Sequence, residues 1–314
     1  MSEEKTQVQN ARKDLDILNK MKNLPGGLVI IPLVIAVVLA TFVPQVFQIG
    51  GYVTALFYEG NACMMGFFLI VCGSMIDIKQ VGMPLYKGVI MTGTKFLLGV
   101  IVGLIVGKIC GPEGFLGIAP FVLIATITNS NGSLYISLSS QFGNATDTGA
   151  ISILSLNDGP FFTLIALGAT GLANIPIKSL IAVLVPLLIG FIWGNLDKGF
   201  RDACKTAQPI VTFFMTISIG AKTDIKTILT AGASGIVLGL ISAATAVIFF
   251  FVINLLLPKK ERNAMGAAIG TTALNSAMTP AAVAEADPSM EGMVSMATAQ
   301  CATCLLYTSP SPRD

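Results

Sequence analysis

The chain has 314 residues, of which 54% are hydrophobic and 11% are charged, with a net charge of +2 and no histidine. A soluble globular domain carries roughly 25% charged residues, so this composition excludes a particle covered by water on all sides. The small net charge gives no support to a nucleic-acid partner, and no histidine can serve as metal ligand, general base or proton relay. We therefore expect an all-α integral membrane protein that lies in a lipid bilayer and needs no cofactor.

The chain begins with a polar arm and continues as a series of apolar segments. Residues 1–24 lack the apolar core of a signal peptide and are predicted to form a cytoplasmic N-terminal arm. Apolar runs that suit membrane spans follow, separated by glycine, proline and charged residues. We number these predicted spans 1 to 9, and they cover residues 27–47, 52–73, 86–108, 116–140, 149–171, 178–196, 207–221, 232–257 and 264–284. A tenth span begins near residue 290.

Lysine and arginine are distributed unevenly over the connections between these spans. If the N-terminus lies inside, most of them fall on the inside, among them Lys79, Lys198 and Arg201, and few fall on the outside, among them Lys108 and Lys178. The positive-inside rule therefore predicts a multi-pass protein with a cytoplasmic N-terminus.

Residues 304–314 differ in character from the rest of the chain and read Cys-Leu-Leu-Tyr-Thr-Ser-Pro-Ser-Pro-Arg-Asp. They end span 10 after about a dozen apolar-leaning residues, which are too few to cross a bilayer. The peptide resembles a translated sequencing adapter, so we interpret it as a non-native tail and span 10 as truncated. The alternative is a genuine short tail.

Two stretches of the chain are similar to two later ones. Gly73 and the sequence Asp-Ile-Lys at 77–79 match Gly220 and the same sequence at 224–226, at an offset of 147 residues. Asn-Ser at 129–130 in span 4 matches Asn-Ser at 275–276 in span 9. Matching spans are five apart, and because five is odd the second copy crosses the membrane in the opposite direction. We therefore predict a ten-helix, inverted-repeat secondary transporter with five-helix repeats at 25–173 and 174–303. Chance similarity between apolar helices is the alternative.

Spans 4 and 9 each contain a cluster of polar and helix-breaking residues. Asparagine, serine and glycine favour turns over helix interiors, and backbone unwinds at membrane depth only where protein or water satisfies it. Broken helices at matching positions of two halves indicate a transport site, in which half-helix N-termini offer N–H groups to an anion. We predict that the substrate binds at Thr128, Asn129, Ser130, Asn131, Gly132, Asn275 and Ser276. The alternative is that these side chains only bond neighbouring helices.

Two ionisable residues lie inside predicted spans. Asp158, next to Asn157 in span 5, is a carboxylate near the bilayer centre, where such groups commonly line ion pathways. We predict that Asp158 and Asn157 couple transport to protons. Lys95 in span 3 is predicted to pair with Asp158 or with an anionic substrate. The alternatives are a structural ion pair, or a lysine that extends to the interface.

The chain resembles the 2-keto-3-deoxygluconate permease family from about residue 24 to 303. The resemblance is carried by the stretches at 25–27, 128–135, 149–160 and 189–197, of which Asn-Gly-Ser-Leu-Tyr and Gly-Asn-Leu-Asp are the most specific. It implies proton-coupled uptake of a sugar acid across the bacterial inner membrane and kinship with bile-acid-symporter-like folds, in which two broken helices cross at the site. Positions that match the family are Lys95, Asn129, Asn131, Gly132 and Asn195. Asp158 stands where the family has an acidic residue that is often glutamate.

Three hypotheses for the function follow. The first is a proton-coupled symporter that imports 2-keto-3-deoxygluconate or a related sugar-acid anion. The second is a sodium-coupled symporter of another organic anion, with the same fold. The third is a non-transporting membrane sensor or an intramembrane enzyme, against which stand the lack of histidine, of a metal-ligand cluster and of a sizeable soluble domain.

Overall fold

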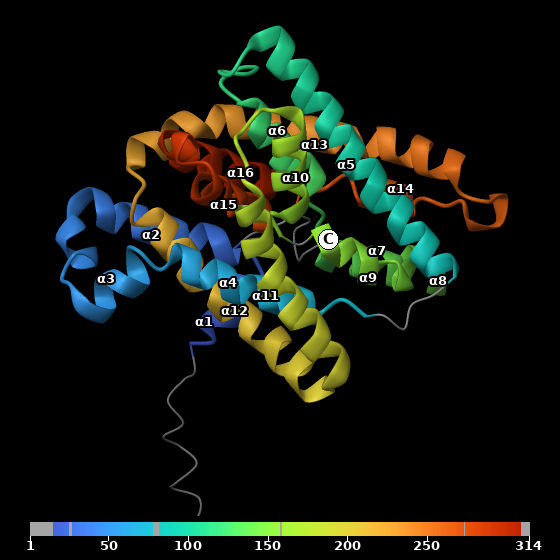
Figure 1. Ribbon diagram of the computed structural model, residues 1–314, viewed down its shortest axis with the longest axis horizontal. Coiled ribbons are helices and arrows are strands. Elements are labelled where there is room, and N and C mark those ends of the chain that lie inside the picture. Colours follow the sequence, from blue (N-terminus) through green and yellow to red (C-terminus); the bar gives the residue numbers. More distant parts are fainter. Residues whose placement is uncertain (1–14, 25–26, 78–81, 158, 273, 309–314) are drawn as a thin grey trace, which may run out of the picture.

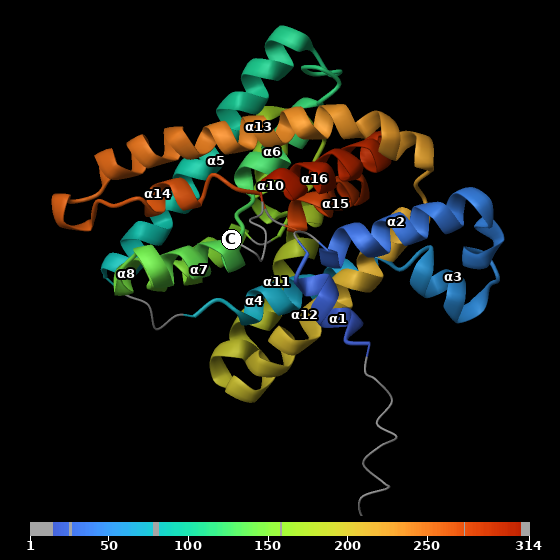
Figure 2. The ribbon, with the colours of Figure 1, turned by 180° about the vertical axis from the view of Figure 1, so that it is seen from behind.

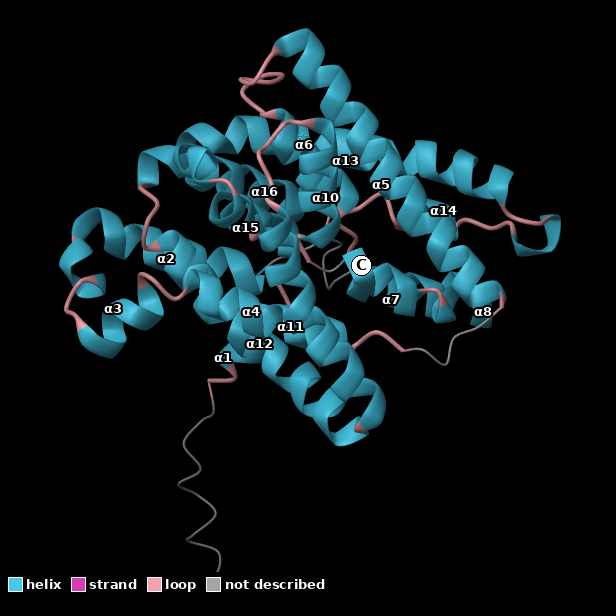
Figure 3. Cartoon of the chain, viewed as in Figure 1, coloured by secondary structure: helices cyan, strands magenta, loops and turns pink. Residues whose placement is uncertain are grey.

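The computed structural model describes residues 15–24, 27–77, 82–157, 159–272 and 274–308. In this part of the chain the secondary structure is helical, and the β-structure consists of an isolated bridge between Phe115 and Ile118 (Figure 3). The helices as far as the middle of the chain are α1 (Ile17–Lys22), α2 (Gly27–Phe42), η2 (Pro44–Phe47), α3 (Gly51–Phe57), α4 (Asn61–Ser74), α5 (Met83–Cys110), α6 (Pro120–Thr128), α7 (Gly132–Phe142), α8 (Ala145–Gly149), α9 (Ile151–Leu154), η3 (Ser155–Asn157) and α10 (Phe161–Thr170). The remaining ones are α11 (Ile177–Leu196), α12 (Lys198–Gly220), α13 (Ile225–Leu256), η4 (Lys259–Glu261), α14 (Met265–Ala268), η5 (Leu274–Ala277), α15 (Thr279–Ala286), η6 (Pro288–Met293) and α16 (Val294–Thr308).

The described residues include three helices that are long and apolar enough to cross a bilayer, namely α5, α11 and α13. The bent pairs α3–α4, with a 56° bend, and α8–α10, with a 58° bend, bring this number to five if each pair is one span. Helix α2 is apolar but shorter. The length and composition of these helices confirm an all-α integral membrane protein, whereas the count of ten spans and their inverted order stay predictions.

The helices form two groups in space (Figures 1 and 2). In the first, the four-helix group, α4 packs against α11 and α12, and α12 packs against α2, with α1 and α3 at its edges. In the second, the crossing group, the long helices α5 and α13 pack against the short helices α6–α10 and α14–α16. The crossing group therefore contains both of the spans that were predicted to break.

Close contacts at glycine recur in the two halves of the chain. A Cβ atom on Gly73 of α4 would overlap the carbonyl group of Leu187 in α11. Gly220 of α12, 147 residues later, lies against the side chain of Ala36 and the carbonyl of Leu33 in α2. Helix α4 thus packs on α11, and α12 packs on α2, through a glycine in each case.

The same correspondence holds in the crossing group. Gly88 of α5 lies against the carbonyl of Ala150 and the side chain of Ile153. Gly235 of α13, again 147 residues later, lies against the carbonyl of Gln300 and the side chain of Thr303 in α16. Small residues allow the backbones of membrane helices to approach closely, so both copies use glycine where a long helix meets a short one.

Several helices begin at side chains that accept hydrogen bonds from their first N–H groups. Asp197 caps α12, Asp224 caps α13 and Asn131 caps α7, while Asn144 and Asp147 form a reciprocal capping box at α8. Such caps satisfy N–H groups that the helix itself leaves without partners. Asp224 therefore fixes where α13 starts.

Two helices extend beyond the spans expected from hydropathy. Helix α12 begins at Lys198 rather than near 207, and α13 begins at Ile225 rather than near 232. Hydropathy detects the part of a helix that lies in hydrocarbon, whereas caps and packing determine where the helix begins. Span 10 starts at Val294, and its helix continues to Thr308, five residues into the segment that was set aside as a tail.

The glycine contacts predict that alanine substitutions at two positions of α4 change the stability of the protein in opposite directions. Gly73→Ala is expected to lower the free energy of unfolding by about 1–3 kcal/mol, because the new methyl group must push α11 away. Gly66→Ala, in the same helix but with no atom near its virtual Cβ, is expected to raise it by up to about 1 kcal/mol through helix propensity. Thermal unfolding of the detergent-solubilised protein, followed by circular dichroism, measures both. A stabilised Gly73→Ala variant would contradict the close packing.

Candidate functional site

Span 4 breaks at the predicted position, between the end of α6 at Thr128 and the start of α7 at Gly132. Asn129 and Ser130 lie in the break with extended backbone at Asn129, and both are 1% exposed. The side-chain amide of Asn129 donates to the Ala125 carbonyl at 2.6 Å, so it satisfies the C-terminal end of its own half-helix. Thr128 does the same for the Ile124 carbonyl. The first break is thus stabilised by residues of span 4 itself.

Span 9 breaks as well, and its break touches that of span 4. Helix α14 ends at Ala268, and α15 begins at Thr279 after the short turn η5. The Thr279 hydroxyl donates to the Asn275 carbonyl at 2.9 Å and accepts the Asn129 amide at 3.5 Å. Thr279, which was not predicted as a site residue, therefore links the two breaks.

Span 5 contributes a third break to the same place. Its first part ends in η3 at Asn157, and α10 begins at Phe161. The Asn275 amide donates to the Asn157 carbonyl at 3.3 Å, so hydrogen bonds run from Asn129 through Thr279 and Asn275 to Asn157. We call the residues Asn129, Ser130, Asn157, Asn275 and Thr279 the crossing site. Asp158, the predicted proton carrier, lies outside the described residues.

The crossing site contains buried polar atoms that have no hydrogen-bond partner among the described residues. These atoms are Oδ1 of Asn129, Oγ of Ser130, and both Oδ1 and Nδ2 of Asn157. All three residues are 1% exposed. A buried polar group without a partner is costly, and several at one point are typical of a site that binds a polar ligand.

The other predicted site residues have more varied surroundings. Asn131 and Gly132 are half-buried, and Asn131 is occupied as the cap of α7, where Oδ1 accepts from Leu134 at 3.0 Å. Thr128 bonds Thr163 of α10 at 2.9 Å, and Ser276 is fully buried. Spans 4 and 9, which carry the two predicted polar clusters, thus break next to each other, and the break of span 5 lies beside them.

Lys95 does not point to a carboxylate in the described part of the chain. Its ammonium donates to the main-chain carbonyls of Ile269 at 2.5 Å and Thr271 at 3.3 Å, directly after α14, and lies 5.2 Å from the centre of the Phe249 ring. The side chain is therefore engaged at the break of span 9 rather than open to a substrate. Asn195, the further position that matches the family, lies in the four-helix group, where its amide donates to Ile76 at 2.8 Å.

An ion cluster that the sequence did not reveal lies at one end of the crossing group. The Lys87 ammonium is 2.6 Å from Asp147 and 2.8 Å from Glu261, and the side chains of Lys87 and Asp147 are fully buried. Asn263 donates to the second oxygen of Asp147 at 2.6 Å, and Thr146 donates to Glu261 at 2.8 Å. We call Lys87, Asp147 and Glu261 the ion cluster. It ties α5 to the start of α8 and to the connection after α13.

Charge and hydrogen bonds shift the pKa of groups at the ends of the crossing group. Hydrogen bonds from Lys87 and then from Thr146 hold the pKa of the Glu261 carboxyl below its usual value. At the other end, bonds from Ser289 and from the Asn174 backbone lower the pKa of Asp287. Both carboxylates therefore stay ionised at neutral pH and act as anchors between connections.

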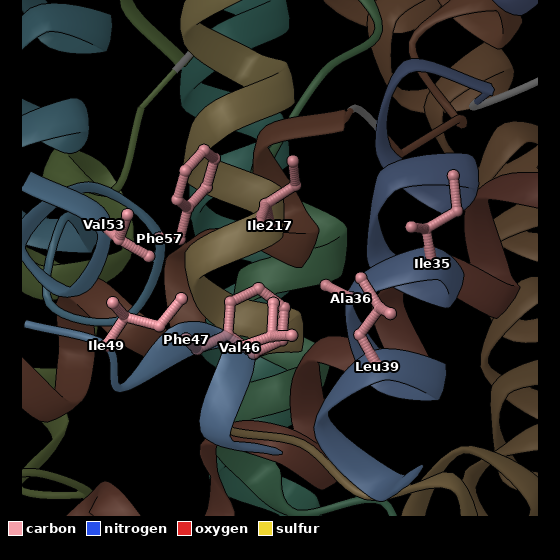
Figure 4. A pocket seen from close by; sticks show the side chains of 9 residues that line it. All are labelled: Ile35, Ala36, Leu39, Val46, Phe47, Ile49, Val53, Phe57 and Ile217. Atoms are coloured by element: carbon pink, nitrogen blue, oxygen red, sulfur yellow. The ribbon is translucent and has the colours of Figure 1, made fainter. Parts of the chain in front are cut away.

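A separate apolar pocket of about 310 Å³ lies at the edge of the four-helix group (Figure 4). Its walls come from α2, η2, α3 and α12, and its lining side chains are Ile35, Ala36, Leu39, Val46, Phe47, Ile49, Val53, Phe57 and Ile217. It has no polar lining, so it does not fit a hydrophilic anion. The described residues contain no group of three or more histidine, cysteine or acidic side chains that could hold a metal ion.

Comparison with known proteins gives a consistent set of relatives. A family model described as 2-keto-3-deoxygluconate permease matches residues 18–310. The chain is 43% identical over 294 residues to "2-keto-3-deoxygluconate permease 1" of Salmonella typhimurium, covering 94% of this chain and 92% of the relative. It is 30% identical over 294 residues to the Bacillus subtilis "2-keto-3-deoxygluconate permease" (92% and 89% covered) and 29% identical over 305 residues to that of Escherichia coli O7:K1 (94% and 91% covered).

The ion cluster predicts an order of stability losses. Lys87→Met leaves two carboxylates without their cation and is expected to cost about 3–5 kcal/mol of unfolding free energy. Asp147→Asn leaves Lys87 paired with Glu261 and is expected to cost less, about 1.5–3 kcal/mol. Asp202→Asn, an exposed carboxylate on α12, is the control and is expected within about 0.5 kcal/mol of the unaltered chain. Denaturant or thermal unfolding in detergent measures all three, and equal effects of the three variants would contradict the buried pairing.

Proposed function

Because the chain belongs to the 2-keto-3-deoxygluconate permease family, we propose that it is a secondary transporter that imports 2-keto-3-deoxygluconate or a closely related sugar-acid anion. Membership of a family of permeases makes the chain a transporter rather than an enzyme. Its bilayer is proposed to be the bacterial inner membrane, with the N-terminus in the cytoplasm, as the distribution of lysine and arginine predicts.

The observation that carries this proposal is the group of unsatisfied polar atoms at the crossing site. Asn129, Ser130 and Asn157 present both hydrogen-bond donors and acceptors in a place from which bulk water is excluded. A sugar acid carries several hydroxyl groups, each of which donates and accepts. Such a ligand would satisfy side chains that are otherwise costly to bury.

The carboxylate of the substrate is proposed to lie near the N-terminal ends of α7 and α15. Both half-helices begin at a break, and α15 has no side-chain cap. Free N–H groups and the positive end of the helix dipole favour an anion at such a position. Lys95 would contribute indirectly, through the break of span 9 on which its ammonium rests.

The proposed transport cycle uses two inverted five-helix repeats, and the matching glycine contacts at Gly73 and Gly220, and at Gly88 and Gly235, support them. In such proteins the site lies near the bilayer midplane between the repeats, and motion of one group of helices against another exposes it to each side in turn. The division into a four-helix group and a crossing group is compatible with this motion.

Coupling to protons is proposed to involve Asp158, with Asn157 beside it at the crossing site. A carboxylate within a membrane span is costly to keep charged. Coupling to sodium, as the second hypothesis has it, would use the same fold, and the transport assay below distinguishes the two.

Removing the Ser130 hydroxyl tests the substrate site. Ser130→Ala deletes a hydroxyl that has no hydrogen-bond partner among the described residues, so the fold should tolerate it, whereas substrate affinity should fall about tenfold, the equivalent of roughly 1.4 kcal/mol for one hydrogen bond. Thr212→Val is the matched control, because its hydroxyl is also buried and without a partner but lies on α12. Binding of 2-keto-3-deoxygluconate to the purified variants measures the effect. Equal affinities of the two variants would place the substrate elsewhere.

Uptake into proteoliposomes tests the coupling. An inward proton gradient is expected to drive accumulation of 2-keto-3-deoxygluconate by the unaltered chain, and Asp158→Asn is expected to lose accumulation while still equilibrating the substrate. Undiminished accumulation by Asp158→Asn would remove this residue from the coupling step. Uptake that follows a sodium gradient and ignores pH would favour the second hypothesis, and a protein that binds the sugar acid without moving it would refute transport.

A further inference from the structure

Lys95 is an unusual side chain for its position in the chain. It lies in the middle of α5, it is 1% exposed, and among the described residues it has no carboxylate partner. A lysine buried at membrane depth is costly and is retained where its charge has a use. The groups around its ammonium define that use.

Main-chain oxygen atoms hold the ammonium of Lys95. The carbonyl oxygens of Ile269 and Thr271 accept its hydrogen bonds at 2.5 and 3.3 Å, and the face of Phe249 lies 5.2 Å away. Two carbonyls and an aromatic face are the surroundings that stabilise a monovalent cation. They do not select an ammonium over a metal ion.

The break of span 9 requires positive charge at this point. The last carbonyls of a helix have no partner within it and carry a partial negative charge. Helix α14 ends just before Ile269, so its end lies in a buried region where water does not satisfy these oxygens. In transporters with broken helices, such oxygens commonly coordinate sodium ions.

The corresponding break in the first half is satisfied without charge. At the end of α6 the neutral side chains of Thr128 and Asn129 bond the carbonyls of Ile124 and Ala125. The offset of 147 residues places the neutral Ser242 of α13 where α5 has Lys95. The two halves therefore differ in charge at a point where their packing is similar, and the cation is specific to span 9.

We propose that the ammonium of Lys95 is a tethered cation that occupies a latent sodium site at the break of span 9. Removing it leaves the carbonyl oxygens of Ile269 and Thr271 free to bind Na⁺. The neighbouring hydroxyls of Thr272 and of Thr92, one turn before Lys95 on α5, supply further oxygen ligands, since both are buried and without a partner. The chain with Lys95 thus needs no sodium ion at this site. The part that the site plays in transport rests on the proposed function.

Thermal unfolding of the purified full chain in detergent tests this site. Each protein is melted in rising NaCl, with choline chloride replacing sodium to keep the ionic strength constant. Lys95→Met, which keeps most of the side-chain volume, is expected to have a lower Tm in choline and to regain roughly 2–4 °C in sodium. The unaltered chain, Lys95→Arg and the control Lys108→Met, an exposed lysine at the end of the same helix, are expected to show no sodium-dependent shift.

Each outcome of the melting experiment either supports or overturns the proposed sodium site. A Lys95→Met protein without a sodium response overturns the proposal, as does an equal sodium response of the unaltered chain. If Lys95→Met can be purified only in sodium, the proposal is supported, and if it fails to fold in sodium as well, the latent site does not exist. Failure of the unaltered chain to transport the sugar acid would refute the proposed function and leave these melting results unchanged, so the two failures are distinguishable.

Discussion

A helix that unwinds inside a membrane exposes main-chain N–H and C=O groups that lipid cannot satisfy, and this constraint organises the molecule. Such breaks occur in spans 4, 5 and 9 of the described structure, and hydrogen bonds among Asn129, Thr279, Asn275 and Asn157 connect them. The breaks stabilise one another because they meet. The same meeting point contains the side-chain atoms that remain unsatisfied, so one constraint accounts for both the stability and the chemical character of the crossing site.

The rest of the crossing group fixes the positions of the broken helices from both ends. At one end the ion cluster joins α5 to α8 and to the connection after α13. At the other, Asp287 accepts from the backbone of Asn174 at 2.7 Å, near the place where Gly107 of α5 approaches Leu172. The anchors lie at opposite ends of α5, and the crossing site lies between them. The four-helix group has its own polar contact, Arg201 with Asp77 at 3.3 Å, so each group is tied together separately.

The sequence predicted the breaks because they depend on local chemistry. Asparagine, serine, threonine and glycine are poor in helix interiors, and their density in spans 4 and 9 was visible without any tertiary information. Contacts between residues that are far apart in the sequence could not be predicted in this way. Lys87 and Glu261 are far apart in the sequence, and Lys87 stands at the start of predicted span 3, whereas the fold buries it completely. The sequence signal that pointed to Asp147 was the capping pattern from Asn144 to Asp147, since an acidic residue in such a box commonly stands in the first turn of a helix.

The difference between the two breaks has a mechanical consequence. The break of span 4 depends on side chains of its own half-helix, so it persists wherever that helix moves. The break of span 9 depends on Lys95, which belongs to α5. Separating α5 from α14 would therefore expose the carbonyl end of α14, whereas the hydrogen bonds that satisfy the end of α6 lie within span 4 itself. The molecule thus has one break whose last carbonyls are satisfied by its own residues and one whose carbonyls are satisfied by a side chain of α5. Both breaks pack near α5, but only the second depends on α5 for its hydrogen bonds.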